Sequence, residues 1–120
     1  MTFSEVLTDA TRNVEGVLAV ALVGLDGIGV ETVLAEGVEG INAEEVEVEL
    51  AGLVGSINKT LSTLAGGKTK EFLLEADNSA YLLSLVDPNY FVAFVLEAGA
   101  NLGRARFEAR RTSQRLRDSF

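Results

Sequence analysis

The sequence has no cysteine, no histidine and no tryptophan among its 120 residues. Without cysteine there is no disulfide and no thiol nucleophile, and without histidine the commonest general base is missing. These two residue types also supply the usual zinc ligands, so we expect no metal site and no cofactor. The longest apolar runs, such as Val17 to Val23, fall well below the roughly 20 residues of a membrane-spanning helix, and we expect no membrane span.

A chain of this length is expected to form one domain over residues 1–120, because it is too short to build two separate cores. Its start, Met1 to Glu5, has neither the basic segment nor the apolar run of a signal peptide. We therefore expect a single cytoplasmic domain.

The net charge of −8 is unevenly spread along the chain. Residues 1–100 hold 4 basic and 16 acidic side chains, a charge of −12, whereas residues 101–120 hold six arginines and two acids, a charge of +4. The overall acidity argues against nucleic-acid binding. The arginines either pair with acids elsewhere on this chain or face an acidic partner, and the sequence leaves both alternatives open.

Capping residues and apolar spacing predict three helices. The first follows the capping pair Thr2 and Glu5 and ends at Gly16. The second follows Asn42 and runs from Glu44 to Ala65. The third begins after Asn101, and one of its sides carries Leu102, Ala105, Ala109, Thr112, Leu116 and Phe120.

Five further segments are predicted to be strands, and their apolar patterns rank them by burial. Those apolar on both faces belong inside a covered sheet: Val17 to Gly24, Tyr81 to Val86 and Tyr90 to Leu96. Val30 to Ala35 and Thr69 to Ala76 have one apolar face and are predicted edges. Asp26-Gly27 and Asp87-Pro88-Asn89 are predicted to form the hairpin turns.

These predictions define an α+β fold in the order α-β-β-α-β-β-β-α. Sequential hairpins make the sheet antiparallel, and outer second and third strands force the first and fifth strands together. The predicted strand order is therefore 2-1-5-4-3. Interior strands that are apolar on both faces need cover on both, so we expect one helix on one face and two on the other.

The second helix carries two interior glycines, each of which costs about 1 kcal/mol relative to alanine. They lie opposite its leucine stripe, which consists of Val46, Leu50, Leu53, Ile57, Leu61 and Leu64. We expect the leucines to pack on the sheet and the glycines to let a second copy approach closely. The predicted dimer interface comprises this glycine side and the exposed edge of the third strand: Val48, Gly52, Gly55, Lys59, Ser62, Thr69, Glu71, Leu73 and Glu75.

Two motifs that suggest nucleotide chemistry do not fit it. The segment Gly66 to Thr69 ends like a phosphate-binding loop, but a helix precedes it and a strand follows, which is the reverse of the required order. A helix C-cap explains its glycines. The glycines at 24, 27 and 29 join two strands, as in a hairpin. With no paired acid and base in the sequence, we expect a protein that is not an enzyme.

The run from Gly99 to Arg106, which leads into an arginine-rich helix after Val92 to Leu96, resembles the Roadblock family of dynein light chains and bacterial small-GTPase partners. Leu25-Asp26-Gly27 and the long second helix followed by Gly66-Gly67 are similar to that family too. The resemblance covers nearly the whole chain. It implies a twofold homodimer built from the second helices and third strands.

The same resemblance implies a noncatalytic scaffold or regulator of a small Ras-like GTPase. The bacterial gliding-motility member of the family is a GTPase-activating protein that binds one GTPase per dimer, with the catalytic residues left to the GTPase. Alternatives for this chain are a small-ligand-sensing domain or a scaffold subunit of a larger complex. Phe107 either packs beneath the first helix or belongs to a partner site. Candidate partner contacts are Glu45, Glu49, Lys59, Arg104, Phe107 and Arg111.

Overall fold

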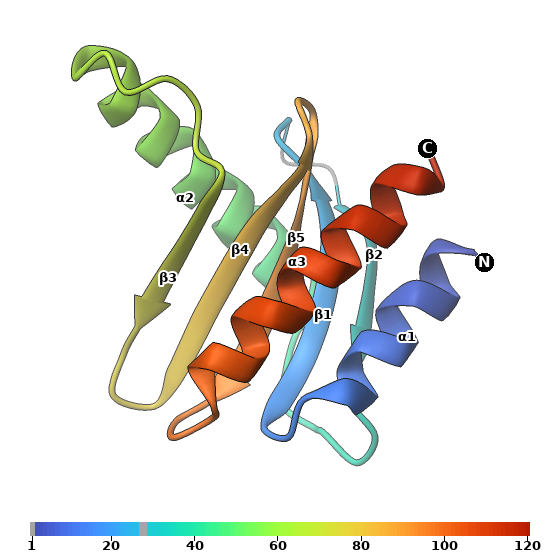
Figure 1. Ribbon diagram of the computed structural model, residues 1–120. Helices are drawn as coiled ribbons and strands as arrows, with labels where there is room; N and C mark the ends of the chain where they lie inside the picture. Colours follow the sequence, from blue (N-terminus) through green and yellow to red (C-terminus); the bar gives the residue numbers. More distant parts are fainter. Residues whose placement is uncertain (1, 27–28) are drawn as a thin grey trace.

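The computed structural model describes residues 2–26 and 29–120, and these form three helices and five strands (Figure 1). Their order is the predicted α-β-β-α-β-β-β-α, and the bounds of the first strand match the prediction. The elements are α1 (Phe3–Asn13), β1 (Val17–Gly24), β2 (Gly29–Leu34), α2 (Ala43–Thr63), β3 (Glu71–Glu75), β4 (Ser79–Asp87), β5 (Tyr90–Glu97) and α3 (Leu102–Asp118).

The strands form one antiparallel sheet in the order β2-β1-β5-β4-β3, as predicted. At its centre Leu22 of β1 lies opposite Val92 of β5, and Phe94 of β5 lies opposite Leu82 of β4. The predicted edge strands β2 and β3 are shorter or less buried than the interior three. The predicted Asp26-Gly27 turn lies partly outside the described residues.

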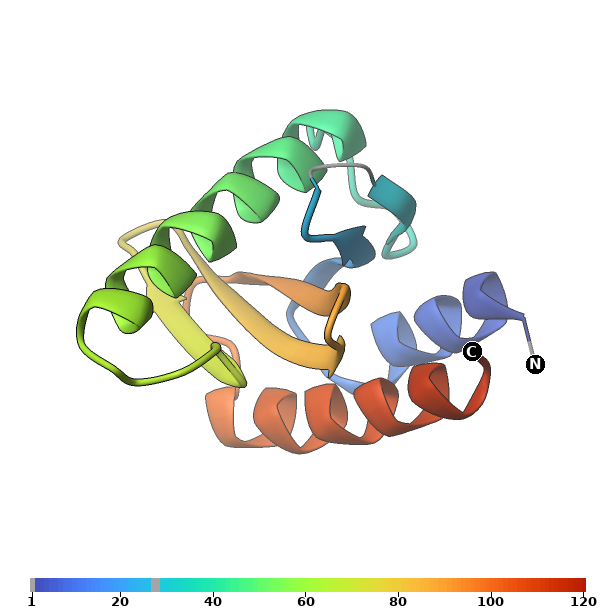
Figure 2. The ribbon, with the colours of Figure 1, turned by 90° about the horizontal axis from the view of Figure 1, so that it is seen from above.

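The sheet separates two helix layers, with α1 and α3 on one face and α2 on the other (Figure 2). The core on the two-helix side is built around Phe94, Leu82 and Leu22, which meet Leu7 of α1 and Leu116 of α3. The core on the α2 side is smaller and is built around Ala21, Leu83, Phe91 and Ala93. This imbalance confirms the predicted arrangement of one helix against two.

The helices begin where the sequence predicts. Thr2 and Glu5 form a reciprocal capping box at the start of α1, with each side chain accepting from the other's backbone N–H at 3.1 Å. The side chains of Asn42 and Asn101 each accept a backbone N–H bond, at 3.0 Å, from the residue three positions on. The Glu5 carboxylate accepts the backbone N–H of Thr2, and this hydrogen bond is the main reason that the pKa of Glu5 is lowered.

The leucine stripe of α2 is not centred on the sheet, which corrects the prediction. The buried residues are Leu50, Ala51 and Val54, and only the first belongs to the stripe. Leu53 is half-buried, and Leu64 lies beyond the helix with 71% of its surface exposed. The helix therefore presents its small residues to the sheet and holds its leucines on one flank, about a quarter turn away.

The end of α2 differs from the predicted glycine cap. The helix ends at Thr63, and the Gly66 N–H donates to the Leu61 carbonyl at 2.7 Å while the Ala65 N–H donates to the Ser62 carbonyl at 3.2 Å. This pair of bonds is a Schellman motif, which needs a left-handed residue after the cap. That residue is Ala65, with φ of 57°, and not one of the two glycines that follow.

The inner side of α3 is more polar than predicted. Ala105, Ala109, Thr112 and Leu116 are buried as expected, but Glu108 is fully buried and Ser113 nearly so. Phe120 lies beyond the helix and is half exposed, yet its ring contacts those of Phe3 and Tyr90, with centroids 5.2 and 5.3 Å away. Among the described residues, the helices include none that is long and apolar enough to cross a membrane.

The left-handed Ala65 gives a stability prediction. A residue with a Cβ atom loses about 1–2 kcal/mol of stability in the left-handed conformation, and glycine avoids this cost. Glycine in turn loses about 0.5–1 kcal/mol because its unfolded chain has more conformational entropy. We expect Ala65→Gly to raise the free energy of unfolding by about 0.5–1 kcal/mol, measured by urea titration at fixed protein concentration. As a control, Ser62→Gly inside the last helical turn should lower it by about 0.5 kcal/mol. Equal losses from both changes would contradict the assigned cap.

Candidate interaction surface

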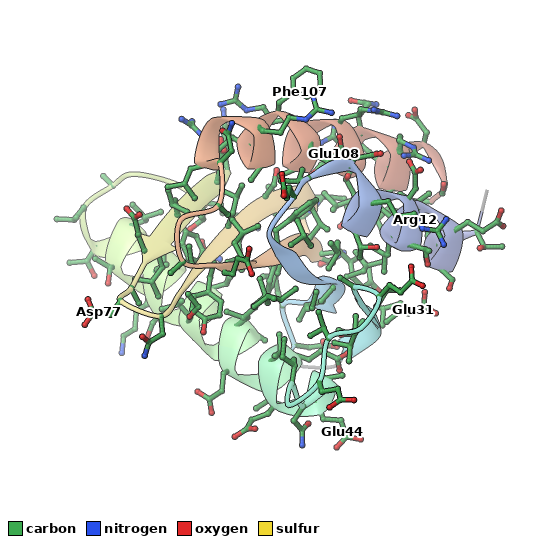
Figure 3. All side chains as sticks on the ribbon, turned by 90° about the horizontal axis from the view of Figure 1, so that it is seen from below. Arg12, Glu31, Glu44, Asp77, Phe107 and Glu108 are labelled. Atoms are coloured by element: carbon green, nitrogen blue, oxygen red, sulfur yellow. The ribbon has the colours of Figure 1, made fainter. Side chains whose placement is uncertain are left out.

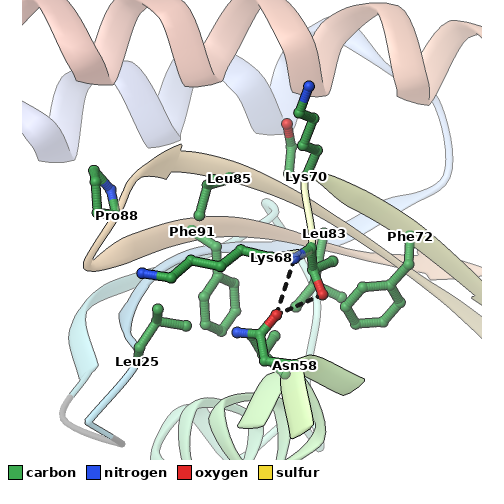
Figure 4. A pocket seen from close by; sticks show the side chains of 12 residues that line it. Leu25, Asn58, Lys68, Lys70, Phe72, Leu83, Leu85, Pro88 and Phe91 are labelled. Carbon is green, nitrogen blue, oxygen red and sulfur yellow. Dashed lines mark hydrogen bonds between the residues drawn. The ribbon is translucent and has the colours of Figure 1, made fainter. Parts of the chain in front are cut away.

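Helix α2 covers its face of the sheet only in part. Its backbone packs close to β1 and β2, and its C-terminal end projects past β3 at the free edge of the sheet (Figure 1). A hydrogen-bonded contact ties that end to the chain before β3, because the Asn58 side chain accepts from the Thr69 N–H and hydroxyl at 2.9 and 2.7 Å (Figure 4). The helix thus crosses the sheet obliquely and leaves a corner of this face without a helix above it.

A groove of about 600 Å³ occupies the uncovered corner. Val46, Leu50 and Leu53 line it from the leucine flank of α2, and Leu74 of β3 lines it from the sheet with 45% of its surface exposed. Apolar walls of this extent are typical of a surface that another molecule covers. The remaining lining residues are Leu18, Gly40, Ile41, Asn42, Glu45, Glu49, Ser79, Tyr81 and Val95.

The edge strand next to this groove is open. β3 pairs with β4 alone, so its outer N–H and C=O groups have no strand partner among the described residues. The opposite edge, β2, is flanked by α1 on one face and α2 on the other, whereas no helix backbone packs closely on β3. Leu73 and Leu74 are exposed on opposite faces of β3. An open edge with apolar side chains is a template for pairing with another chain.

The glycines of α2 lie on the flank that faces away from the groove. A Cβ atom added at Gly52 or Gly55 would meet no atom within 4 Å, and neither residue lines the groove. Val48, Lys59 and Ser62 share this flank and are exposed. The structure therefore leaves the glycine flank and the leucine flank open on opposite sides of the helix.

Three of the four predicted contacts at β3 lie on one face of the sheet, and the fourth precedes the strand. Glu71, Leu73 and Glu75 point to the α3 side of the sheet, and Thr69 lies in the connection from α2. Glu71 is engaged within the chain, because its carboxylate accepts from Arg106 at 3.1 Å and from Arg110 at 3.3 Å. Partial burial raises the pKa of Glu71, but the two arginines outweigh it and hold the pKa below its ordinary value of 4.5.

Two further arginines of α3 contact acids of the same chain. Arg115 donates to Asp9 of α1 at 2.6 Å, and this hydrogen bond is the main reason that the pKa of Asp9 is lowered. Arg111 lies 3.8 Å from the buried carboxylate of Glu108. Pairing with acids elsewhere on the chain is therefore confirmed for Arg106, Arg110 and Arg115, whereas Arg111 lies near an acid of its own helix.

Phe107 is exposed over 56% of its surface, so the prediction that it packs beneath α1 is wrong. Its ring stands out from α3 and the Arg104 guanidinium lies 5.4 Å from the ring centroid (Figure 3). The periodicity of α3 had placed Phe107 off the apolar side, and the inward place is taken by Glu108, to which the Asn13 side chain donates at 2.9 Å.

The groove differs from the other hollows and side-chain clusters in its size and its apolar lining. Where the structure describes the chain, it brings together no group of three or more His, Cys, Asp or Glu residues that could hold a metal ion. The small pocket around Asn58, Lys68 and Phe72 in Figure 4 has a cavity volume of about 10 Å³, room for little more than one water. Hollows of about 440 Å³ beside Asp77 and about 310 Å³ beside Arg12 have mostly polar walls, whereas the groove is larger than either and mostly apolar.

Some residues of this surface were predicted from the sequence and others were not. Glu45 and Glu49, predicted partner contacts on α2, lie at the groove, whereas Lys59 lies on the glycine flank. Leu74 and Tyr81 were not predicted as site residues. The alternation of β3 places Leu74 on the face opposite Glu71 and Glu75, and Tyr81 pairs with Leu74 in the sheet. Only the oblique path of the helix shows that both are uncovered.

No protein-family model matches the chain, and no curated protein matches it. Among solved structures, MglB in a tetrameric arrangement has a TM-score of 0.88 at 14% identity, covering 97% of this chain and 85% of its own. MglC from Myxococcus xanthus has a TM-score of 0.73 at 29% identity over 100% of both chains. A Roadblock/LC7 domain from Streptomyces avermitilis has a TM-score of 0.82 at 13% identity, covering 96% and 94%. The chain has a Roadblock-type fold.

The ion pairs of β3 give a prediction for pH. Replacing Arg106 and Arg110 by glutamine leaves Glu71 with its partial burial alone, so its pKa should rise above 4.5, as followed by NMR titration of the carboxyl carbon. In the unchanged protein this carboxylate stabilises the fold above its unfolded pKa, and the contribution is lost as pH falls through the lowered folded pKa. The control Arg12→Gln should leave the Glu71 titration unchanged, and an unchanged titration in the double variant would exclude the ion pairs.

Proposed function

We propose that this protein is a noncatalytic homodimeric regulator or scaffold that binds a small Ras-like GTPase. The observation that carries the proposal is the position of the apolar groove beside the open edge of β3, which one second copy can fill and pair at the same time. A single twofold axis through the β3 edges satisfies both needs.

The geometry of that axis determines which parts meet. Antiparallel pairing of β3 with its copy extends the sheet across the axis and occupies the free backbone groups. The C-terminal end of α2, which projects past β3 in Figure 1, then lies over the sheet of the other copy, at the corner where Leu74 and Tyr81 line the groove. The same rotation brings the second α2 into the first groove, so the two contacts are equivalent.

In this arrangement the two α2 helices meet through their leucine flanks. The half-buried residues Leu53, Ile57 and Leu61 and the exposed Leu64 become covered, and burial of apolar surface stabilises the contact by about 25 cal/mol per Å² before the costs of association. A contact through Gly52 and Gly55, which the sequence predicts, is the alternative. It would leave the groove unfilled, and for this reason we favour the leucine flank.

The GTPase as a partner is supported by the fold and by the sequence resemblance. The chain shares its fold with MglB and MglC structures, and one of these is an MglB in a tetrameric arrangement. Paired α2 helices would present Glu45 and Glu49 of both copies on one surface. Because α2 carries Lys59 and no arginine, acceleration of GTP hydrolysis would come from positioning the GTPase's own loops and not from an arginine finger.

A second candidate function uses the same groove for a small ligand. Its volume of about 600 Å³ suits a metabolite, and the Ser79 hydroxyl, which donates to the Tyr81 hydroxyl at 2.9 Å, offers polar groups at its wall. A metabolite bound to the purified protein, found by mass spectrometry after denaturation, would favour this function over the dimer.

Two matched variants test the dimer contact. Leu74→Glu places a charge in the proposed interface at a position already exposed in one chain, so it should shift light scattering from dimer to monomer while the circular dichroism spectrum is retained. Gly55→Leu adds bulk on the opposite flank and should leave the dimer mass unchanged. The reverse result, with Gly55→Leu dissociating the subunits, would establish the glycine contact instead.

The partner is tested with purified small Ras-like GTPases from the source genome. We expect the GTP-bound form of one of them to be retained on the immobilised dimer, and we expect the Leu74→Glu monomer to retain less of it because the paired α2 surface is lost. Single-turnover GTP hydrolysis with and without the protein measures stimulation. Neither binding nor a changed hydrolysis rate with any of these GTPases would refute this part of the proposal.

A further inference from the structure

The outer side of α3 combines exposed positive charge with an exposed aromatic ring. Phe107 has Arg104, Arg110 and Arg111 as its neighbours three or four residues away along the helix, and Gly103 completes the set. The ion pairs leave these arginines well exposed, with 63% of the Arg110 side chain and 48% of the Arg111 side chain still accessible. This surface lies on the two-helix side of the sheet, away from the groove.

Opposite charge is concentrated in one other part of the same chain. Residues 29–49 carry seven glutamates and no lysine or arginine. No ion pair between described residues includes the five exposed ones, which we call the acidic lobe: Glu36, Glu39, Glu44, Glu45 and Glu49.

The acidic lobe also has an exposed apolar residue. Val48 is exposed over 58% of its surface, and Glu44 and Glu45 are its helical neighbours four and three residues before it. Each surface therefore has an exposed apolar residue surrounded by charged side chains. The charges are opposite in sign, since Phe107 lies among arginines and Val48 among glutamates. Figure 3 shows Phe107 and Glu44 on opposite sides of the molecule, so the two cannot meet within one chain.

We propose that the arginine-lined face of α3 around Phe107 docks on the acidic lobe around Val48 of a second copy. The contact is heterologous, because different surfaces of the two copies meet, and it links dimers into larger assemblies. The charge of −12 over residues 1–100 would repel an anionic membrane or nucleic acid, whereas the acidic lobe supplies matched charge with an apolar centre. Glu45 and Glu49 line the groove that the α2 dimer fills, whereas Glu36, Glu39, Glu44 and Val48 do not, so the centre of the acidic lobe and the Phe107 face stay accessible in that dimer.

Charge reversal on each side tests the contact. Arg104→Glu replaces the third helical residue after the Asn101 cap by the residue that completes a capping box, so α3 should remain folded. Glu44→Lys reverses the other side. By sedimentation velocity in about 0.1 M salt, we expect the unchanged protein to form species larger than the dimer and each variant to lose association about tenfold. Phe107→Ser should weaken it too.

Mixing the variants is the decisive step. In the mixture, the Arg104→Glu copy keeps its acidic lobe and the Glu44→Lys copy keeps its arginine-lined face. These two unchanged surfaces can meet, so the mixture should associate where each variant alone does not. Arg12→Glu makes the same change in net charge on exposed α1 and should associate as the unchanged protein does. Raising the salt to about 1 M should dissolve the assemblies while the α2 dimer persists.

Three outcomes would overturn the proposal. The first is an unchanged protein that stays dimeric at every concentration in low salt. The second is loss of association with Arg12→Glu equal to that with Arg104→Glu. The third is the absence of assemblies together with Phe107-dependent binding to phosphatidylserine vesicles, which would assign the face to a membrane. Because the dimer is measured in the same experiment, failure here is distinct from failure of the α2 contact.

Discussion

One helix cannot cover one face of a five-stranded sheet, and the surface properties of this protein follow from that mismatch. Five strands spaced about 4.8 Å apart span about 20 Å, whereas a helix with its side chains is about 10 Å wide. The opposite face has two helices and a closed core. On the α2 face, the helix lies obliquely over β1 and β2 and leaves the ends of β3 and β4 uncovered, which is where the groove lies.

The residues of α2 suit a helix that packs one side on the sheet and leaves two flanks open. Ala51 and Val54 are small enough to let the helix approach the sheet, and Glu47 accepts a hydrogen bond from Thr32 of β2, which anchors the N-terminal half. Leu53, Ile57 and Leu61 lie on the flank, where they are half-buried in one chain and become fully buried only if a second chain covers them. The leucine stripe thus belongs to the core only in part, and Val46, Leu50 and Leu53 also form the helical wall of the groove.

The sequence was sufficient for the order and pairing of the strands because burial on two faces leaves a different pattern from burial on one. β1 is apolar throughout and β5 is apolar up to Leu96, and no arrangement other than a central one hides them. The buried side of α2 could not be read in the same way, since the leucines and the core residues differ by a fraction of a turn and the larger side chains dominate the periodic signal. The burial of Glu108 was equally hidden, because its stabilising contact with Asn13 joins residues 95 positions apart.

Interaction with the helix dipole explains the positions of some charged residues in α2 and α3 but not of others. Glu44 and Glu45 in the first turn of α2, and Arg115 and Arg117 in the last turn of α3, interact favourably with the helix dipole. Arg104 and Arg106 do the opposite, because they place positive charge near the first turn of α3, which has no acidic residue. Arg106 is offset by its ion pair with Glu71. For Arg104, the contacts within the chain are the Phe107 ring and a long hydrogen bond of 3.4 Å to the Asn13 carbonyl, so its interaction with the helix dipole is not offset by an ion pair among the described residues.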